Sequence, residues 1–382
     1  MRSARITVFA LLAFVITACG THDFPQYPPN YREYAYITNG GSGTVTVLDA
    51  VNVRIDRELP VGRNPVAVTA SPTRNEVYVV NSGLIGGDGS VSVINTENNS
   101  VAGTIPVHHQ PVSIDLDSDG SLAYVANSGS NTVSVLDLKA RREIAQISTG
   151  LEPDSARIAP DGKSLVVANR GGNNVSIIDP ATGKIRAVFA GCPGASDAVI
   201  LPDSTKTFVA CAAGHQVIVI ALAHSKFNPD QPDRLETFLD VGRAPVQLAL
   251  KPDGGEIFVS NSVSDSISEI YAGTDEVGGA SMIGDDPVRG LVSADNTMLY
   301  VGNLRSQWVS VYAIEDGRRI GSIHVGDGPS ALAFSSSGLL LFVVDARSAD
   351  VAVVRTASRS LFTMLPTGRA PNSIAVKAFK LS

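Results

Sequence analysis

A short pattern of apolar and polar positions returns eight times along the 382-residue chain. Each copy has one aromatic or aliphatic residue, two small or β-branched residues, and one polar residue that is usually Asn. The copies begin at Tyr36, Tyr78, Tyr124, Val166, Phe208, Phe258, Tyr300 and Phe342. Their starts lie 42, 46, 42, 42, 50, 42 and 42 residues apart. Repeats of about 40–45 residues built from short strands are typical of the blades of a β-propeller.

The repeat over residues 153–191 shows the pattern of one blade most clearly. Its strand candidates are residues 155–158, 164–168, 174–178 and 184–189. Turn sequences such as Pro-Asp-Gly and Asp-Pro-Ala-Thr-Gly separate them, because Pro presets φ, Gly accepts positive φ and Asp bonds to the neighbouring backbone. The pattern therefore predicts four antiparallel, hairpin-linked strands per repeat.

A Gly-x-x-Pro turn or a variant of it precedes the first strand of seven repeats, at Pro65, Pro111, Pro153, Pro245, Pro287, Pro329 and Pro371. Ala195 holds the equivalent position in the fifth repeat. Pro371 has no tetrapeptide after it, and Tyr36 has no Pro turn before it. Both gaps disappear if residues 372–379 supply the inner strand of the blade that begins at Tyr36, which also removes free sheet edges.

The chain is therefore predicted to be all-β. We expect an eight-bladed β-propeller over residues 34–382, with four antiparallel strands per blade and the first blade closed by the C-terminal strand. Over about residues 33–380 the repeats, such as Tyr78-Val79-Val80-Asn81, resemble the YVTN family of β-propeller repeat proteins. That resemblance implies the fold but no single activity, since the family ranges from surface-layer proteins to periplasmic proteins. Related propellers include the haem d1 domain of nitrite reductase and bacterial lactonases.

Residues 1–18 have the features of a bacterial secretory signal. Two arginines precede a mostly apolar stretch over residues 6–16, which is too short to span a membrane comfortably. The sequence Ile16-Thr17-Ala18-Cys19 follows, and it resembles the lipobox of bacterial lipoproteins. The resemblance implies that Cys19 is lipidated and becomes the mature N-terminus. An ordinary secretory signal with an incidental cysteine is the alternative.

The residues after Cys19 indicate where the anchor lies. Gly20 follows the cysteine, not the Asp that favours retention in the inner membrane, so the resemblance implies attachment to the outer membrane. Residues 19–33 contain three prolines and few aliphatic residues, and we expect them to form a tether. The expected location is the bacterial cell envelope, with the membrane as a partner through the N-terminal lipid.

The loops before the inner strand and after the second strand of each blade open on one rim of a propeller, around the axial funnel where function usually lies. Five arginines are expected to form an arc at this rim across blades seven, eight, one and two: Arg63, Arg289, Arg305, Arg347 and Arg369. Guanidinium groups match the oxygens of carboxylate, phosphate or sulfate, so the arc predicts an anion site. Solvated loop arginines balanced by Asp285, Asp286 and Asp327 are the alternative.

Polar residues one or two positions after the Pro position are expected to line the funnel. Most of these positions hold Val, Ala or Ser, and the exceptions are Asp154, Asp197, Gln247 and Asn372, together with Arg289.

Cys192 and Cys211 are the two cysteines left after Cys19, in a compartment that is expected to be oxidising. A hairpin that turns near residues 203–204 places residues 195–196 opposite 211–212, so the two cysteines should lie close together. Cys211 also replaces the usual Asn, in the same blade in which the Pro turn is altered. We therefore predict a disulfide. Attachment of a metal or haem is a weaker alternative, because no Cys-x-x-Cys-His run is present.

The remaining chemistry is sparse. His108, His109 and His215 are weak metal candidates, because adjacent histidines point to different sides of an extended strand and blades three and five are not neighbours. No Ser-His-Asp spacing, nucleophile elbow or phosphate-binding glycine loop is visible. We predict no metal and no cofactor. A net charge of −7 and a pI near 5.4 argue against nucleic-acid partners.

These observations favour a non-catalytic propeller on the outer membrane that binds a protein partner or a small anionic ligand. The alternative is an enzyme or cofactor carrier. It would be a lactonase-like hydrolase, or a haem d1-like binding protein that uses one of the three histidines.

Overall fold

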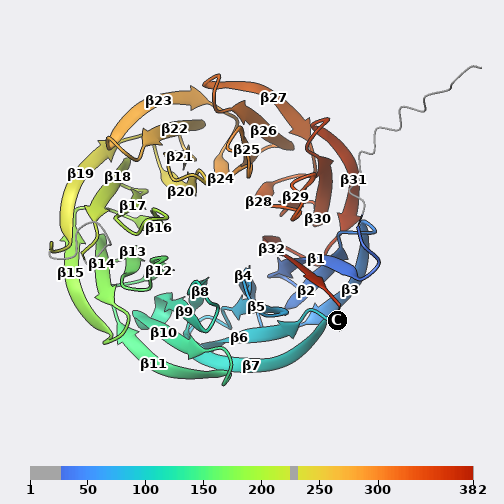
Figure 1. Cartoon of the computed structure of the whole chain (residues 1–382), viewed down its shortest axis with the longest axis horizontal. Helices are drawn as coiled ribbons and strands as arrows, with labels where there is room; N and C mark the ends of the chain where they lie inside the picture. The colour runs from blue at the N-terminus through green and yellow to red at the C-terminus, as the bar shows by residue number, and fades with distance from the viewer. Residues whose placement is uncertain (1–26, 224–230, 382) are drawn as a thin grey trace, which may run out of the picture.

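The structure is a computed structural model that describes residues 27–223 and 231–381. The predicted signal at residues 1–18 and the predicted lipidation site, Cys19, lie outside the described residues. Eight four-stranded sheets stand around a central axis and form a closed ring (Figure 1). The prediction of an eight-bladed β-propeller is confirmed. In the described part of the chain, no helix is long and apolar enough to cross a membrane.

Each blade has an inner strand at the axis, two middle strands and an outer strand. From the inside outward, blades one to four are β32 (Pro371–Lys380), β1 (Tyr31–Asn39), β2 (Thr44–Asp49) and β3 (Arg54–Pro60); β4 (Pro65–Ala70), β5 (Glu76–Asn81), β6 (Asp88–Asn95) and β7 (Ser100–His109); β8 (Pro111–Leu116), β9 (Leu122–Asn127), β10 (Thr132–Asp137) and β11 (Arg142–Ser148); β12 (Pro153–Ile158), β13 (Leu165–Asn169), β14 (Asn174–Asp179) and β15 (Lys184–Ala190).

Blades five to eight follow the same order. They are β16 (Ala195–Ile200), β17 (Lys206–Cys211), β18 (Gln216–Ala221) and β19 (Arg234–Asp240); β20 (Pro245–Leu250), β21 (Glu256–Asn261), β22 (Ser266–Tyr271) and β23 (Glu276–Met282); β24 (Pro287–Val292), β25 (Met298–Asn303), β26 (Trp308–Ala313) and β27 (Arg318–His324); β28 (Pro329–Phe334), β29 (Leu340–Asp345), β30 (Asp350–Arg355) and β31 (Ser360–Pro366). One 3-10 turn, η1 (Ser128–Ser130), links β9 to β10.

The ring closes as the sequence predicted. Strand β32 pairs antiparallel with β1, from Tyr31 opposite Lys380 to Asn39 opposite Pro371. Strand β1 begins at Tyr31, whereas the sequence placed the start of the propeller at residue 34. The strand starts earlier because its first residues, from Tyr31 to Glu33, pair with the end of β32. Glu33 is completely buried and accepts hydrogen bonds from the Tyr31 hydroxyl (3.0 Å) and from the Ser336 hydroxyl (2.9 Å) of blade eight.

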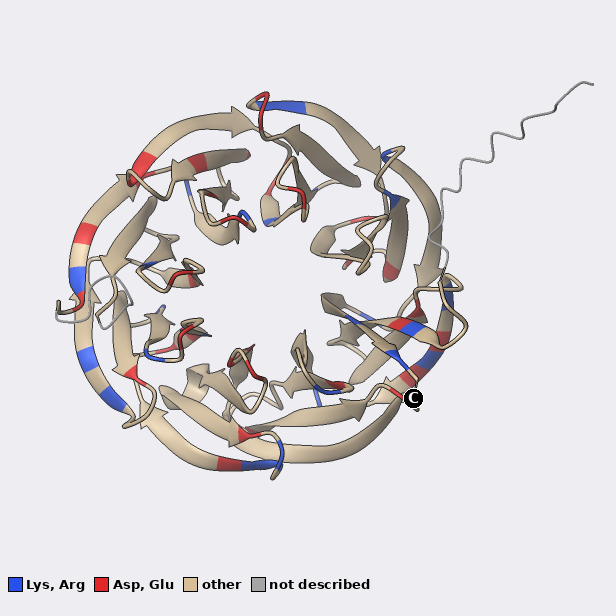
Figure 2. Ribbon diagram, in the orientation of Figure 1, with Lys and Arg blue, Asp and Glu red and all other residues tan. Residues whose placement is uncertain are grey.

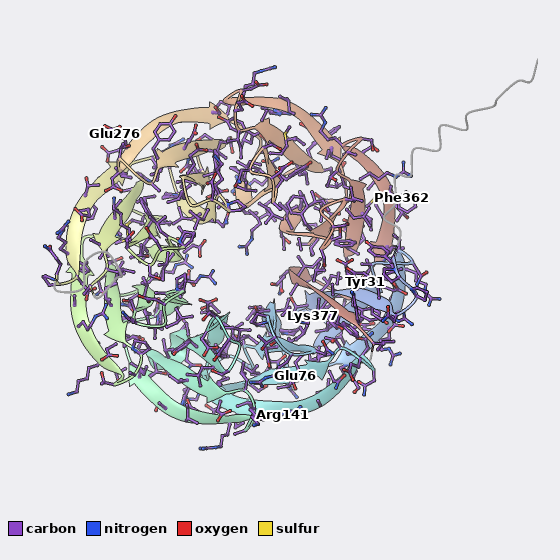
Figure 3. All side chains as sticks on the ribbon, in the orientation of Figure 1. Tyr31, Glu76, Arg141, Glu276, Phe362 and Lys377 are labelled. Atoms are coloured by element: carbon purple, nitrogen blue, oxygen red, sulfur yellow. A yellow bond between two sulfur atoms is a disulfide. The ribbon has the colours of Figure 1, made fainter. Side chains whose placement is uncertain are left out.

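The tetrapeptide forms the second strand of each blade and builds the core. Its aromatic residue is buried between adjacent blades, as at Tyr78 and Phe208. One apolar cluster, for example, joins Tyr78 and Val80 of blade two to Ile114 and Val125 of blade three. Burial of these apolar surfaces is the main favourable term holding one blade on the next. An ion pair on the outside, Arg141 to Glu76 at 2.9 Å, also connects blades two and three (Figure 3).

The polar residue of the tetrapeptide caps the strand by bonding to the next one. The Asn127 amide donates to the Ser134 hydroxyl at 2.9 Å, and the Asn169 amide donates to Ser176 at the same distance. The glycine of the Gly-x-x-Pro turn packs directly on this Asn. A Cβ on Gly150 would meet Asn169 Cγ at 2.6 Å, which explains why the turn carries glycine.

The longest repeat spacing arises from an insertion around residues 222–236. Its two ends are held together by Asp233, whose carboxylate accepts hydrogen bonds from the Ala223 N–H (2.8 Å) and from two nitrogens of Arg186 (2.9 and 2.8 Å). Because Arg186 belongs to blade four and Asp233 to blade five, this side-chain pair also joins neighbouring blades.

Candidate functional site in the axial channel

The inner strands enclose a cavity of about 390 Å³ on the propeller axis. Its lining includes Asp115, Arg157, Gln247 and Arg289. Two further cavities, of about 260 and 190 Å³, share Arg157, Gln247 and Arg289 with it. The three adjoining spaces therefore form one central site, the axial channel.

A bulge at the start of each inner strand turns these side chains toward the axis. In blade four, Pro153 pairs with Asn169 and Ser155 with Ala168, so that Asp154 is an extra residue in the strand. The same irregularity follows the Pro position in the other blades. Bulges re-aim side chains without breaking a sheet, and here the charged and amide side chains of the channel lie at the first, second or fourth residue after the Pro position.

Arg157 and Asp197 form the ion pair at the centre of the site. An Arg157 terminal nitrogen lies 3.1 Å from Asp197 Oδ1, with 34% of the arginine side chain and 14% of the aspartate side chain exposed. Burial opposes the charge of Arg157, but Asp197 and Asp115 outweigh it and raise the pKa of the guanidinium. The positive charge of Arg157 is therefore balanced by the carboxylates beside it.

Arg289 stands apart because no carboxylate pairs with it directly. Within residues 27–223 and 231–381 it has neither a hydrogen bond nor an ion pair, although it lines all three cavities. Burial lowers the pKa of its guanidinium, Asp197 opposes this shift, and Arg157 adds to it. Arginine still carries its charge at neutral pH, so the channel holds one cation with free donors.

Carboxyl groups complete the electrostatics. Burial raises the pKa of Asp115, although Arg157 opposes the shift. Burial also raises the pKa of Asp154, against the effect of Arg170, whose nitrogen lies 3.8 Å away. Both carboxyls thus hold their protons more tightly than a solvated aspartate does.

Several channel residues also join one inner strand to the next. Asp115 accepts a hydrogen bond from the Ile158 N–H at 2.9 Å, and Asp197 accepts one from the Leu248 N–H at 3.1 Å. Gln247 accepts from the Gly290 N–H at 2.7 Å. In blade one, the Asn372 amide donates to the Pro65 carbonyl at 3.0 Å. These oxygens and amides therefore satisfy backbone groups at the edges of neighbouring inner strands.

The structure places all four predicted funnel residues, Asp154, Asp197, Gln247 and Asn372, at the channel. It does not bring the five predicted arginines together. Arg289 lies in the channel, whereas Arg63, Arg305, Arg347 and Arg369 lie exposed in rim loops.

Three of the four rim arginines have local partners. Arg305 lies 3.2 Å from Asp286, Arg347 lies 3.7 Å from Asp327, and Arg369 donates to the Gly41 carbonyl at 3.0 Å. Figure 2 shows acidic and basic residues interspersed around the ring, without a sector of a single charge. The pairing of Arg305 and Arg347 with aspartates matches the alternative reading of solvated, balanced loop arginines.

Sequence reasoning missed Asp115 and Arg157. Both are the fourth residue after the Pro position, in the inner strands of blades three and four. The available signal was a charged residue inside an otherwise apolar strand, as in Val112-Ser113-Ile114-Asp115-Leu116. Only the bulge shows that this position faces the axis.

The three histidines lie away from the channel lining. His108 Nε2 lies 3.2 Å from Glu143, and His109 Nδ1 lies 3.1 Å from Asp88. His215 Nδ1 accepts a hydrogen bond from the Ala244 N–H at 3.2 Å. Among the residues that the structure describes, no three His, Cys, Asp or Glu side chains are grouped so that they could hold a metal ion.

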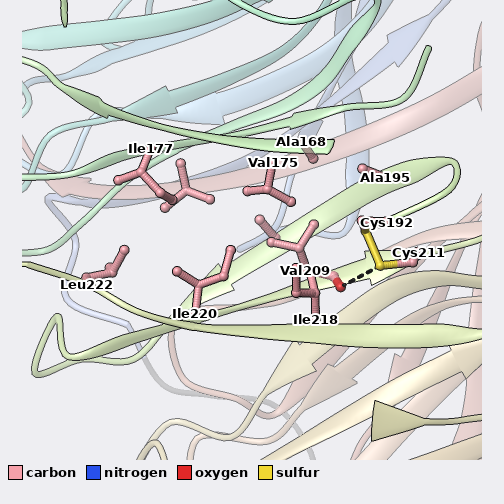
Figure 4. Close-up of a cluster of buried hydrophobic side chains, with 12 residues drawn as sticks. Ala168, Val175, Ile177, Cys192, Ala195, Val209, Cys211, Ile218, Ile220 and Leu222 are labelled. Atoms are coloured by element: carbon pink, nitrogen blue, oxygen red, sulfur yellow. Dashed lines mark hydrogen bonds between the residues drawn. A yellow bond between two sulfur atoms is a disulfide. The ribbon is translucent and has the colours of Figure 1, made fainter. Parts of the chain in front are cut away.

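The predicted disulfide is present in blade five (Figure 4). Cys192 and Cys211 are joined with an S–S distance of 2.06 Å, and both are fully buried in an apolar cluster with Val175 and Ile218. Ala195 pairs with Cys211, as the hairpin count predicted. Cys192 precedes Ala195 by three residues, so it occupies the place that Gly150 has before Pro153. The disulfide therefore replaces the contact between glycine and asparagine found in blade four.

A model of the YNCE-like β-propeller family matches residues 91–226. No curated protein matches the chain in sequence. Among solved structures, the dihydro-haem d1 dehydrogenase NirN is similar, with 17% identity over 92% of this chain and 76% of that one, at a TM-score of 0.72.

Two further solved structures are similar. Apo AztD from Citrobacter koseri has 14% identity, covering 91% of this chain and 98% of that chain, with a TM-score of 0.68. The periplasmic gluconolactonase PpgL from Pseudomonas aeruginosa has 18% identity over 91% and 98%, with a TM-score of 0.60. At these identities the likeness concerns the fold alone. The family match and the eight repeated sheets together show that this chain is a β-propeller repeat protein.

Proposed function

We propose that this protein is a non-catalytic binding protein of the bacterial cell envelope that holds a small anionic ligand in its axial channel. The observation that carries the proposal is Arg289, a guanidinium without an ion pair in a cavity of about 390 Å³. A cation enclosed by protein and left without a counter-charge is costly unless a ligand supplies one. Arginine offers paired donors to carboxylate, phosphate or sulfate.

The proposal is tested by replacing the two kinds of arginine in parallel. Calorimetry with acetate, phosphate and sulfate should detect a ligand for the native protein, and Arg289→Gln should weaken its binding by about tenfold to a hundredfold, as expected for loss of a charged hydrogen bond. Arg305→Gln is the matched control, because that arginine is exposed and paired with Asp286. Equal affinity of native protein and Arg289→Gln for every anion would contradict the proposal.

We also propose that Cys19 carries a lipid that anchors the protein to the outer membrane. Support comes from the lipobox-like sequence and from the position of the first described residues. Glu33 bonds to Ser336, in the turn between β28 and β29, which lies on the face opposite the rim loops. Seven residues lie between Cys19 and Tyr27, and the eight steps from one to the other reach at most about 28 Å, so the anchored propeller would open its rim away from the membrane.

Cell fractionation tests the anchor. The native protein should sediment with outer membranes, and Cys19→Ser should release it to the soluble fraction or leave its signal uncleaved. Mass spectrometry of the mature N-terminus provides the control, because an acylated cysteine has a distinctive mass. A native protein with an unmodified N-terminus would exclude the anchor.

A hydrolase is the second candidate, favoured by the raised pKa of Asp115 and Asp154 in the channel. A general acid needs such a carboxyl close to substrate. A screen of lactone hydrolysis with native protein and with Asp154→Asn tests it. Turnover by the native protein that Asp154→Asn abolishes would favour the enzyme, and its absence would favour the binding role.

A further inference from the structure

The two walls of the axial channel differ in chemistry. Every ionisable side chain lining the 390 Å³ cavity, namely Asp115, Arg157 and Arg289, comes from blades three, four and seven. Among the described residues, the wall from blades eight, one and two has no ionisable side chain: Val66, Ala67 and Ile374 are partly exposed there, beside the polar Asn372 and Ser373.

The wall from blades eight, one and two keeps hydrocarbon in contact with the channel. Val66 and Ile374 remain partly exposed on the axis. Covering such surface with another hydrocarbon is favourable, because apolar area is then removed from water. A ligand that fills the cavity therefore gains from an apolar part on this side.

The charged wall has room for one negative group. Arg157 is already paired with Asp197, which leaves Arg289 as the free guanidinium. A second negative charge on the ligand would find no second unpaired guanidinium among the described lining residues. It would instead lie near the carboxyl groups of Asp115 and Asp154. Like charges at short distance are repulsive, so a single anionic group is favoured over two.

We infer that the ligand is an amphipathic monoanion, a carboxylate with a hydrocarbon body, whose head lies at Arg289 and whose body lies against Val66, Ala67 and Ile374. This inference rests on the proposed binding of an anion in the channel. The cavity volume lies at the lower end of the range of small-molecule sites, which is about 300–1,000 Å³, and it sets the size of the body.

A homologous series of straight-chain carboxylates tests the inference by calorimetry on the purified full-length protein. From acetate to octanoate the dissociation constant should fall by roughly threefold to fourfold for each added CH₂, until the cavity is full. Succinate should bind at least tenfold more weakly than hexanoate, and 1-octanol at least tenfold more weakly than octanoate.

A second variant separates the two parts of the ligand. Val66→Thr keeps the shape of the wall but adds a hydroxyl, so it should reduce the gain in affinity for each added CH₂. The affinity for acetate should not change, because acetate has no hydrocarbon chain to reach this wall. Arg289→Gln should weaken every carboxylate alike. Thermal unfolding of each variant checks that the propeller is intact.

The outcomes distinguish the inference from the proposed function. Carboxylates that bind through Arg289 with affinities independent of chain length would overturn the amphipathic ligand and leave anion binding standing. Equal binding of octanoate and octanol would overturn it as well, because the charge would then play no part. Failure of every anion tested, including phosphate and sulfate, would overturn both.

Discussion

Blades five and eight differ from the other six at the same point, the polar end of the second strand. Six blades place Asn there, and its amide donates to the following strand, as Asn169 does to Ser176. Blade five has Cys211, joined to Cys192. Blade eight keeps the neighbouring glycine, Gly326, but has Asp345, which is fully buried.

The two substitutions lie at the same strand end but link it to different neighbours. In blade five, the disulfide joins the end of β17 to the turn before the inner strand β16, by a covalent bond that does not depend on pH. In blade eight, Asp345 lies opposite Asp350 across β29 and β30. Burial, together with the facing Asp350, raises the pKa of Asp345 to about 8. A protonated Asp345 can donate a hydrogen bond to Asp350, as the Asn amide donates to the next strand in six other blades. The link in blade eight therefore depends on a proton, whereas the disulfide in blade five does not.

The largest expected effect on stability comes from removing the disulfide of blade five. Replacing both cysteines by Ala should lower the free energy of unfolding by about 3 kcal/mol, because the bond closes a loop of 19 residues. The double change Cys192→Gly with Cys211→Asn restores the pair found in blade four and should lose less. Urea unfolding of the three proteins measures the difference, and a loss as large in the Gly/Asn protein as in the Ala protein would show that the two pairs are not equivalent.

The next effect concerns the contact between glycine and asparagine in blade four. Gly150→Ala places a Cβ 2.6 Å from Asn169 Cγ and should cost about 1–3 kcal/mol through overpacking. Gly279→Ala is the matched control, because a Cβ there meets nothing within 4 Å. Thermal unfolding should separate the two variants clearly. Similar melting temperatures would mean that the close approach of glycine to asparagine is relaxed at little cost.

The last effect concerns the proton in blade eight and depends on pH. The pKa of Asp345 in the folded protein, about 8, lies above its ordinary value of 3.8. The contribution of this proton to stability is therefore complete below about pH 4 and is lost as the pH rises to about 8. Asp345→Asn supplies a donor that does not titrate, so it should differ least from the native protein at pH 5 and stabilise the protein increasingly as the pH rises to 8 and 9.

Melting curves of native protein and Asp345→Asn at pH 5, 7 and 9 check the sign. The difference in melting temperature should grow with pH. A constant difference would place the pKa of Asp345 outside this range and remove the contrast between the two blades. The Cys192 and Cys211 variants are the control, since their loss should not change with pH between 5 and 7.

Much of the fold could be predicted from the sequence, because strands and turns depend on residues that are close together in the chain. The tetrapeptide spacing and the Pro turns located the strands, and in the repeat over residues 153–191 each predicted strand agrees with β12 to β15 within two residues at either end. Counting across one hairpin was enough to bring Cys192 and Cys211 together, because the register of a hairpin follows from its turn.

Only part of the candidate site could be predicted from the sequence. Residues such as Gln247 and Asn372 were placed at the channel by counting from the Pro position. Their hydrogen bonds to Gly290 and Pro65 join different blades, and the sequence does not show which groups of adjacent blades meet. The partners of Arg305 and Arg347 depend in the same way on loop conformation.

The sequence by itself determined the eight-bladed ring, its closure by the last strand and the covalent link in blade five, because periodic burial and hairpin register are local properties of the chain. The tertiary structure alone decided which arginine is free. Arg157 and Arg289 both line the channel, but Asp197 neutralises the first at 3.1 Å and leaves the second without a partner in the described residues. Charge compensation depends on distances between blades, and those exist only in the closed ring.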